Sequence, residues 1–326
     1  MSRRSKSFLA ILFVFVGISA IIYYYNVIAK TQEMHDNVRE ILTYVKETIG
    51  YSARLDNYHW LYHKYQRKLC DLDKQSIDKL SKYSTREDQE FKNLKAIRYV
   101  NDFFHGFIQN PHISFCKEIK RFGGEYKSFC KYFDGQKFVC MDSLIQDITR
   151  SECLIYSFGV ANDWSFEDVM DDLGCKVYAF DGTVNHPKRR GKNIYFEKIF
   201  IGSENNEIKN TQTIPTILAR YGHTNTTISY LKTDIEGYEM QVLPQALDEG
   251  TLRNVQQIGM EFHKVDDAKK TDFFIRLLRR LYLEGNYRLI SYDVNACNRN
   301  LMKRTGGYYN LAEIVLLKVS NNNNCV

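Results

Sequence analysis

The chain is poor in residues that interrupt compact structure. It contains four prolines in 326 residues. It also has no internal repeat, and no low-complexity tract precedes a short run of asparagines at 321–324. These absences exclude a linker-rich, disordered protein. An apolar content of 44% is sufficient for a sizeable core, and the length fits one large α/β domain with an appendage.

A strong excess of charge is also absent. The net charge of +6 is modest for this length, and basic residues are interspersed with acidic ones outside one dense stretch, His186–Lys192. Nucleic-acid binding therefore has little support. The basic stretch has two readings, a site that attracts an anionic acceptor or a solvated loop, and the loop is the favoured one.

One segment near the amino terminus contains no charge at all, from Ser7 to Ala29. As a helix its core, Phe8 to Ile28, would cover about 30 Å, the thickness of a hydrocarbon layer. Basic residues precede it and residues of mixed sign follow, which predicts a cytosolic tail and type II topology. A cleaved signal peptide ending near Ala29 is the alternative, although the apolar core is longer than usual for one. We expect residues 1–30 to be a signal anchor, with the bulk of the chain in the endoplasmic reticulum or Golgi lumen or outside the cell.

The cysteines are interpreted through this topology. A lumenal domain would place all eight in an oxidising compartment, where two or more disulfides are compatible with an even number. No Cys-x-x-Cys pair occurs, which disfavours structural zinc. Three cysteines just ahead of the first predicted strand are the expected disulfide partners: Cys116, Cys130 and Cys140. Cys153 and Cys175 fall on predicted core strands and are expected to be buried thiols. Asn225 begins the one N-x-S/T acceptor, and its glycosylation would indicate lumenal exposure.

Two regions follow the predicted anchor. Apolar residues at helical spacing with mixed charge between them predict a helical stem over 31–110, and Asn110-Pro111 marks its end. From 111 to 320 short apolar runs alternate with helical patterns, which predicts a mostly parallel sheet; residues 321–326 form a disordered tail. Seven strands are expected, at Cys153–Tyr156, Cys175–Asp181, Ile194–Ile199, Thr227–Leu231, Val255–Phe262, Tyr287–Tyr292 and Ala312–Val319.

The first two of these strands belong to a unit of the nucleotide-binding kind. A small-residue turn, Ser157 to Asn162, follows the first strand, and a helix from Trp164 to Gly174 follows the turn. The second strand ends in Asp181, about 20 residues beyond the turn, which is the spacing at which a carboxylate can reach ribose hydroxyls.

Further acids lie at the tips of later strands. Leu231 to Glu239, the run LKTDIEGYE, places Asp234 and Glu236 after the fourth strand, and Glu261 and His263 end the fifth. Ligands gather outside the carboxyl ends of strands in open α/β sheets, which makes these residues candidates for chemistry. Strand alternation sends Glu261 and His263 to the same side.

Together the stretches YSFGVANDWSFE, VYAFDGT and LKTDIEGYEMQVL resemble the S-adenosylmethionine-dependent methyltransferases of the FkbM-like class, and most closely the methyltransferase-like protein 24 family. The resemblance covers roughly 111–319 and implies a Rossmann-like, seven-stranded sheet with helices on both faces. It also implies that the first turn wraps the methionine part of the cofactor and that Asp181 holds its ribose. The residues that it assigns to cofactor lining are Ser157, Phe158, Gly159 and Asn162.

One departure from that family pattern concerns the first turn. Most such enzymes begin it with an acid, whereas this chain has Ser157 there and keeps Gly159 alone of the glycines. Another acid must then face the cofactor's ammonium group, and Asp163 or Glu167 is expected to do so. A degenerate site that binds no cofactor is the alternative.

Two chemical roles compete for the acids at the strand tips. In the first, Asp234 or His263, with Glu261 beside it, is the general base that takes a proton from an acceptor hydroxyl. In the second, which is less favoured, Asp234, Glu236, Glu261 and His263 supply ligands to a divalent cation. Without a chemical role, Glu236 would cap the following helix and His263 would be a core histidine.

The expected function is therefore a membrane-anchored, lumenal methyltransferase that uses S-adenosylmethionine and methylates a hydroxyl or carboxyl oxygen of a small molecule or glycan. One alternative is a type II glycosyltransferase with a D-x-E metal site at Asp234 and Glu236. The other is a catalytically inactive methyltransferase fold that serves as a tethered binding module. The predicted partners are the acceptor and the membrane, without nucleic acid.

Overall fold

The computed structural model describes residues 71–84, 94–108, 111–112, 115–129, 132–263, 268–294 and 311–319. The chain divides into two compact units, Met1–Tyr65 and Gln66–Val326, and every described residue belongs to the second. No helix in the described part is long and apolar enough to cross a membrane. The predicted anchor at 1–30 and the stem up to residue 70 lie outside the described residues.

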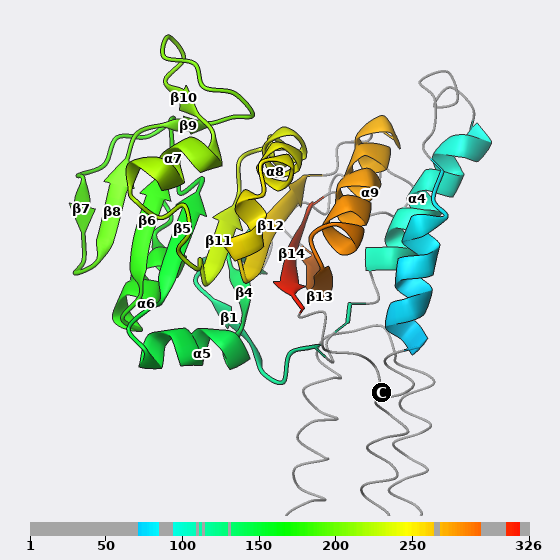
Figure 1. Ribbon diagram of the computed structural model, residues 1–326, viewed down its shortest axis with the longest axis horizontal. Helices are drawn as coiled ribbons and strands as arrows, with labels where there is room; N and C mark the ends of the chain where they lie inside the picture. The colour runs from blue at the N-terminus through cyan, green and yellow to red at the C-terminus, as the bar shows by residue number, and fades with distance from the viewer. Residues whose placement is uncertain are drawn as a thin grey trace, which may run out of the picture. The chain divides into compact units, whose positions relative to one another are not determined.

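A single large sheet organises the second unit (Figure 1). From one edge to the other its strands are β13 (Tyr287–Val294), β14 (Leu311–Lys318), β12 (Gln257–His263), β11 (Tyr230–Thr233), β5 (Leu154–Phe158), β6 (Lys176–Phe180), β8 (Ile194–Glu197) and β7 (Arg189–Arg190). The five strands from β12 to β8 are parallel. β14 is antiparallel to both of its neighbours. The predicted Rossmann-like, mostly parallel sheet is confirmed, with the two-residue β7 as an eighth strand paired antiparallel to β8.

The order of the strands creates a switch point between β5 and β11. From β5 the chain builds outward through β6 and β8, and it then returns to the other side of β5 to build β11 and β12. Open α/β sheets bind their ligands at such a reversal, outside the carboxyl ends of the strands. The turns after β5, β6 and β11 are therefore where this fold places a site.

The two faces of the sheet bury separate cores because side chains alternate along each strand. Tyr156 and Phe158 of β5 pack on the face covered by α7 (Ile214–Arg220), α8 (Glu239–Asp248) and α9 (Ala268–Leu283), and Figure 1 shows these helices side by side over it. Ile155 packs on the opposite face with α5 (Met141–Thr149), α6 (Ser165–Asp172) and β4 (Lys137–Cys140). The prediction of helices on both faces is confirmed.

Two helices that the sequence assigns to the stem pack with this sheet. Leu80, on a helix over 71–81, and Phe104, on α4 (Leu94–Ile108), belong to the core beneath α9. The Asp73 carboxylate accepts a buried hydrogen bond from Arg288 Nε at 2.7 Å. The structure therefore places the predicted boundary at Asn110-Pro111 inside the second compact unit, which begins at Gln66.

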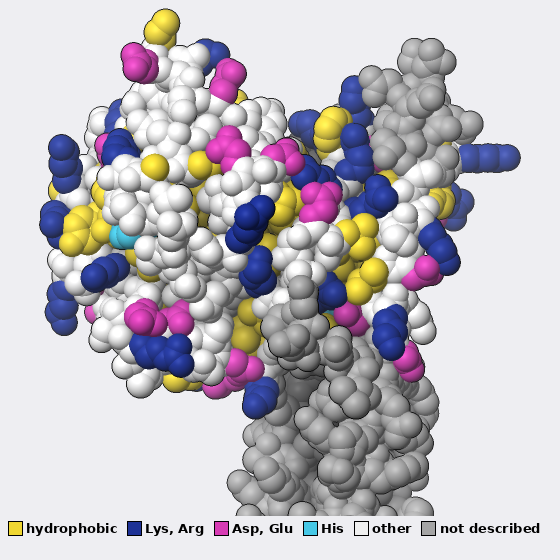
Figure 2. All heavy atoms as spheres, in the orientation of Figure 1, with side chains coloured by type: hydrophobic (Ala, Val, Ile, Leu, Met, Phe, Trp, Pro, Cys, Tyr) yellow, Lys and Arg dark blue, Asp and Glu magenta, His cyan; other side chains and the backbone are white. Residues whose placement is uncertain are grey.

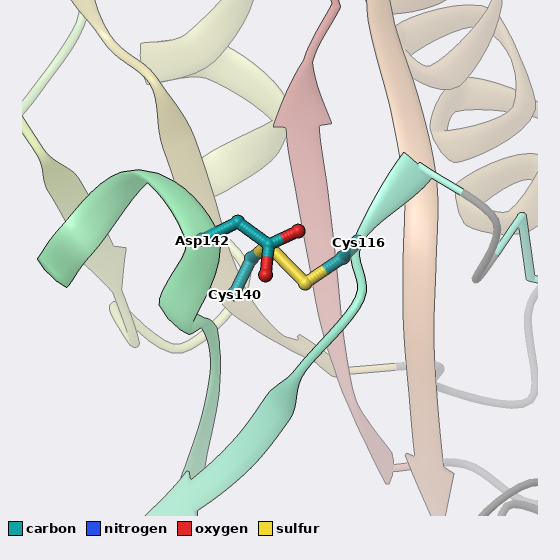
Figure 3. Close-up of side chains that lie close together, drawn as sticks. All are labelled: Cys116, Cys140 and Asp142. Carbon is teal, nitrogen blue, oxygen red and sulfur yellow. A yellow bond between two sulfur atoms is a disulfide. The ribbon is translucent and has the colours of Figure 1, made fainter. Parts of the chain in front are cut away.

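Two disulfides lie near the amino ends of the parallel strands. Cys116 bonds to Cys140 (Figure 3), as the clustering of these cysteines predicts; Cys130, the third of that group, lies outside the described residues. The expectation of buried thiols at Cys153 and Cys175 is wrong, because these residues bond to each other. Both precede adjacent parallel strands, and the backbone N–H of Lys176 already donates to the Cys153 carbonyl at 2.9 Å.

The remaining elements are short. They are β1 (Ile119–Phe122), which pairs with β4; β2 (Glu125–Lys127), which pairs with β3 (Tyr132–Asp134); β9 (Phe200–Ile201), which pairs with β10 (Thr211–Gln212); and the 3-10 helix η3 (Thr251–Asn254). β4 packs against β12 and β14. It runs from the carboxyl end of β12 at Lys137 to the amino end of β12 at Cys140.

Candidate functional site

The turn after β5 is built around a glycine. Gly159 has a φ of +81°, and Ala161 has a φ of +47°. The Gly159 N–H donates to the Phe180 carbonyl at 2.9 Å, which holds the turn against the tip of β6. A Cβ at position 159 would overlap the Asp234 carbonyl oxygen, so only glycine allows the β5 and β11 tips to meet this closely.

Asp181, at the tip of β6, fastens this turn. Its Oδ2 accepts the N–H groups of Val160 at 3.0 Å and Ala161 at 2.8 Å. Its Oδ1 accepts the N–H and the hydroxyl of Thr183 at 2.7 and 2.6 Å. Burial acts to raise the pKa of Asp181, but these bonds outweigh it and the pKa is lowered. Since a carboxylate has about four acceptor positions, a ribose contact at Asp181, which stays a prediction, requires one of these bonds to be exchanged.

Ser157 takes part in a buried polar cluster beneath the turn. Its hydroxyl donates to Glu167 Oε1 at 2.6 Å. Lys232 Nζ donates to the same oxygen at 2.9 Å and to the Gly159 carbonyl at 2.9 Å. All three side chains are buried. Glu167, one of the two acids expected to replace the missing one, therefore lies under the turn, where its charge is paired with an ammonium group of the chain itself.

The other predicted cofactor residues lie in different surroundings. Asp163 Oδ1 accepts the Ser165 N–H at 2.9 Å in an Asx turn that opens α6. The Phe158 side chain is fully buried in the core under α7 and α8, so only its backbone can line a ligand. Asn162 is exposed at the tip of the turn.

The turn after β11 also has left-handed backbone conformations. Glu236 has a φ of +58° and Gly237 a φ of +93°. Glu239 Oε1 accepts the Ile235 N–H at 2.7 Å. Glu239, the first residue of α8, therefore ties the start of this helix back to the turn after β11. Strained conformations of non-glycine residues cluster at functional sites, and Glu236 lies two residues beyond Asp234.

Three acids converge on one lysine where the carboxyl ends of β11 and β12 lie beside the amino end of the antiparallel strand β14. Lys137 Nζ lies 3.1 Å from Asp234 Oδ2 and 2.5 Å from Glu313 Oε1. Glu261 and Glu313 are directly opposite each other in the ladder between β12 and β14, an arrangement that repels unless a cation lies nearby. Carboxylate oxygens of Asp234, Glu261 and Glu313 lie within 4.8 Å of one another, close enough to hold a metal ion.

The charges in this cluster shift two pKa values. Burial opposes the charge on Lys137, but Asp234, Glu313 and Glu261 outweigh it and hold the pKa of the ammonium well above its usual value. Burial, together with the charges of Asp234 and Glu261, raises the pKa of Glu313 to about 8, although Lys137 acts to lower it. Near neutral pH the cluster therefore keeps its lysine charged and a proton on Glu313.

Sequence reasoning brought out only part of this site. Asp234 and Glu261 are predicted residues that the structure brings together. His263 ends β12, but its side chain lies outside the described part of the chain. Lys137, Lys232 and Glu313 were missed. A signal existed for Glu313, since it is one acid inside the apolar run Leu311–Leu317, and a charge in such a run needs a partner.

A second group of potential metal ligands belongs to the disulfide region. Cys116, Cys140 and Asp142 lie close together (Figure 3), but the two sulfurs are bonded to each other and offer no thiolate. Asp142 accepts the Lys117 N–H at 2.7 Å. A cavity of about 220 Å³ beside it, lined partly by Phe115 and Leu317, lies at the amino edge of the sheet, away from the switch point.

The basic stretch His186–Lys192 is largely held by the fold. Arg190 makes two hydrogen bonds of 2.7 Å to Asp168, and the Arg189 guanidinium lies 3.7 Å from the centre of the Tyr195 ring. His186 Nε2 lies 2.8 Å from the Ala161 carbonyl oxygen. Figure 2 shows Lys and Arg side chains spread among acidic ones over the visible face. These contacts hold the basic side chains against the domain, and two of the residues, Arg189 and Arg190, form the short strand β7.

The comparison with known families agrees with this arrangement. A family model described as a methyltransferase domain matches residues 71–305. The match includes the helix over 71–81, α4 and the tips of β5, β6, β11 and β12, and it ends before β14. No curated protein matches the chain. The match covers well over half of the sequence, and the chain belongs to this family of methyltransferase-domain proteins.

Proposed function

We propose that the domain transfers a methyl group from S-adenosylmethionine, and that the cofactor binds at the turns after β5 and β6. The observation that carries this proposal is the Gly159 turn, which Asp181 fastens at the sheet's switch point. Open α/β sheets bind adenosine-type cofactors at this position. The residues fit such a ligand, because the turn has no side chain at Gly159, where a Cβ would fill the space between the tips of β5 and β11.

Asp234 is the proposed general base. It follows β11 directly, and its side chain is 22% exposed, so it is accessible to an acceptor and still paired with Lys137. The cofactor supplies an activated methyl group on a sulfonium sulfur, so the protein mainly has to align the two substrates and exclude water. Asp234 accepts the proton that an acceptor hydroxyl loses on methylation. We infer O-methylation of a hydroxyl on a small molecule or glycan.

The proposed setting is the secretory lumen, with the chain anchored by residues 1–30. Two disulfides in the described part of the domain support it, because such bonds persist in oxidising compartments. Asn225 is exposed in a turn, as a glycosylation acceptor has to be. Treatment of the cell-expressed chain with an endoglycosidase tests this setting: a mobility shift that disappears in Thr227→Ala supports it, and no shift in the wild type contradicts it. Membership of the FkbM-like class stays part of the proposal.

The glycosyltransferase alternative receives less support from the geometry. Its D-x-E site needs Asp234 and Glu236 to share a cation. The carboxylates that converge in the described structure are Asp234, Glu261 and Glu313, and Glu236 lies on the turn that leads to α8.

Calorimetry separates the candidates. The full-length chain, purified in mild detergent with its disulfides intact, is titrated with S-adenosylmethionine, with S-adenosylhomocysteine, and with a UDP-sugar plus manganese. Binding of the first two supports the proposal, whereas binding of the UDP-sugar alone supports the alternative. If none of the three ligands binds, the chain is a binding module with an inactive methyltransferase fold. A 2′-deoxyribose analogue of S-adenosylhomocysteine tests Asp181: a preference for the ribose form that Asp181→Asn abolishes supports a direct contact.

A further inference from the structure

Lys232 joins the two sequence motifs of the domain. It lies on β11 directly opposite Ser157 of β5 in the parallel ladder, two residues before Asp234. Its ammonium donates to the Gly159 carbonyl on the β5 turn and to Glu167 on α6, both at 2.9 Å. One side chain on β11 therefore fixes the turn and the helix that follows it.

Both charged partners of this contact, Lys232 and Glu167, are buried. Glu167 is fully buried and Lys232 is 4% exposed. A buried ion pair adds little net stability over an apolar pair of similar volume, although breaking it by removing one partner costs much. Stability alone therefore does not account for a charged pair here. The contact that an apolar pair could not make is the hydrogen bond to the Gly159 carbonyl.

That bond acts on a turn whose conformation is otherwise costly. Gly159 and Ala161 have positive φ angles, and the N–H groups of Val160 and Ala161 are held from the other side by Asp181. Lys232 holds the carbonyl of Gly159 from below. The N–H groups of the turn are thus held by a carboxylate and its Gly159 carbonyl by an ammonium group.

We propose that Lys232 is a positioning residue for the cofactor: its ammonium group, neutralised by Glu167, holds the Gly159 carbonyl and so presets the turn that receives the donor. This inference rests on the function proposed above. Preorganised turns gain affinity because less ordering remains for the ligand to impose. Loss of Lys232 should therefore weaken binding beyond any effect on folding.

A double substitution separates positioning from stability. Lys232→Met alone leaves Glu167 as an unpaired buried charge and should lower the melting temperature. Lys232→Met combined with Glu167→Gln removes both charges while keeping the side-chain volumes similar, so the melting temperature should recover. The hydrogen bond to the Gly159 carbonyl stays absent in the double variant. We expect its dissociation constants for S-adenosylmethionine and S-adenosylhomocysteine to be at least about tenfold higher than those of the wild type.

A buried ion pair remote from the turn provides the matched control. Asp73 and Arg288 are buried and 2.7 Å apart, and they join the helix over 71–81 to β13. Asp73→Asn combined with Arg288→Met should leave cofactor affinity within about twofold of wild type, measured on the same full-length chain in detergent.

The outcomes distinguish the two proposals. The positioning role is supported if the wild type binds the cofactor and the Lys232→Met and Glu167→Gln double variant binds it more weakly while its melting temperature recovers. Wild-type binding with equal affinity in the double variant overturns it and leaves the methyltransferase function intact. No binding by the wild type overturns the proposed function itself. Should the double variant fail to fold, Lys232→Arg decides, because it keeps the charge but replaces the compact ammonium group with a larger planar guanidinium. Weakened binding then supports the role, and unchanged binding overturns it.

Discussion

Gly159 and Asp234 meet across the switch point of the sheet. A Cβ on Gly159 would overlap the Asp234 carbonyl oxygen, and the Asp234 N–H donates to Phe158, the last residue of β5, at 2.9 Å. The glycine turn proposed to receive the cofactor and the acid proposed to act on the acceptor therefore lie in direct contact. A bound donor and acceptor would be brought together by the same two strand tips.

Substitution of this glycine should be costly for two reasons. Gly159→Ala adds a side chain at a positive φ and drives it into the backbone of Asp234, so we expect the free energy of unfolding to fall by about 3 kcal/mol or more. Gly222 has a φ of +74°, and in the described part of the chain no neighbouring side chain or backbone lies within 4 Å of where its Cβ would be. Gly222→Ala should therefore cost only about 1–2 kcal/mol. Denaturant unfolding of the two variants checks this. Equal losses would show that the contact with Asp234 carries no energy.

Asp181 should make stability depend on acid pH. Its pKa is lowered in the folded state, so its contribution is complete above the unfolded pKa of about 3.9 and is lost as the pH falls through the folded pKa. At pH 7, Asp181→Asn should lower the free energy of unfolding by about 2 kcal/mol, because an amide cannot accept all four bonds. The difference should shrink below about pH 4. Melting temperatures measured from pH 7 to pH 3 test this, and a difference that stays constant with pH contradicts it.

The Lys137 cluster predicts opposite effects for its members. Lys137→Met removes the buried cation that faces Asp234, Glu261 and Glu313 and should destabilise the fold by about 3–5 kcal/mol. Glu313 keeps its proton up to about pH 8 in the folded state, whereas the unfolded chain releases it near 4.3. The wild type therefore loses stability as the pH rises through this window, and Glu313→Gln removes that loss.

The measurement for this cluster is the free energy of unfolding at pH 5 and pH 8. The advantage of Glu313→Gln over the wild type should be larger at pH 8. Glu152, an exposed acid on the loop before β5, provides the control substitution Glu152→Gln, which should show no such trend. An advantage of Glu313→Gln that is the same at both pH values would mean that Glu313 is ionised throughout.

The disulfide between Cys153 and Cys175 should contribute measurably to stability. It closes a loop with a sequence separation of 22, and loops of this size are worth about 3 kcal/mol. The double substitution Cys153→Ser and Cys175→Ser should lower the unfolding free energy by about that amount, measured without reductant. Mass spectrometry after alkylation of the unfolded wild type provides the independent check, since labelling of these cysteines would contradict the bond.

The sequence predicted the sheet because local signals and topology agree there. Apolar runs separated by small-residue turns mark β5, β6, β11 and β12, and an acid follows or ends all but one of them. The sequence does not predict that β14 runs antiparallel to its neighbours or that β7 pairs with β8. Both features depend on where each strand joins the sheet, and no local pattern shows this.

The contacts inside the site were harder to predict, because they join residues that are far apart in the chain. Asp181 could be assigned to a strand tip, but nothing local shows that the N–H groups of Val160 and Ala161, on the turn after β5, donate to it. Lys232 belongs to the motif LKTDIEGYE, in which only the acids were considered as site residues. Its contact with Glu167 depends on how α6 packs against β11, which the sequence does not show. The bond between Cys153 and Cys175 likewise follows from the pairing of β5 with β6.

The central claim is that the turns after β5 and β6 bind S-adenosylmethionine, and calorimetric titration of the wild-type full-length chain tests it most directly. The account predicts one-to-one binding of the donor and of S-adenosylhomocysteine, with affinity lost in Gly159→Ala and reduced in Asp181→Asn. A correctly folded, disulfide-bonded chain that releases no heat with either compound, at several temperatures, would contradict it.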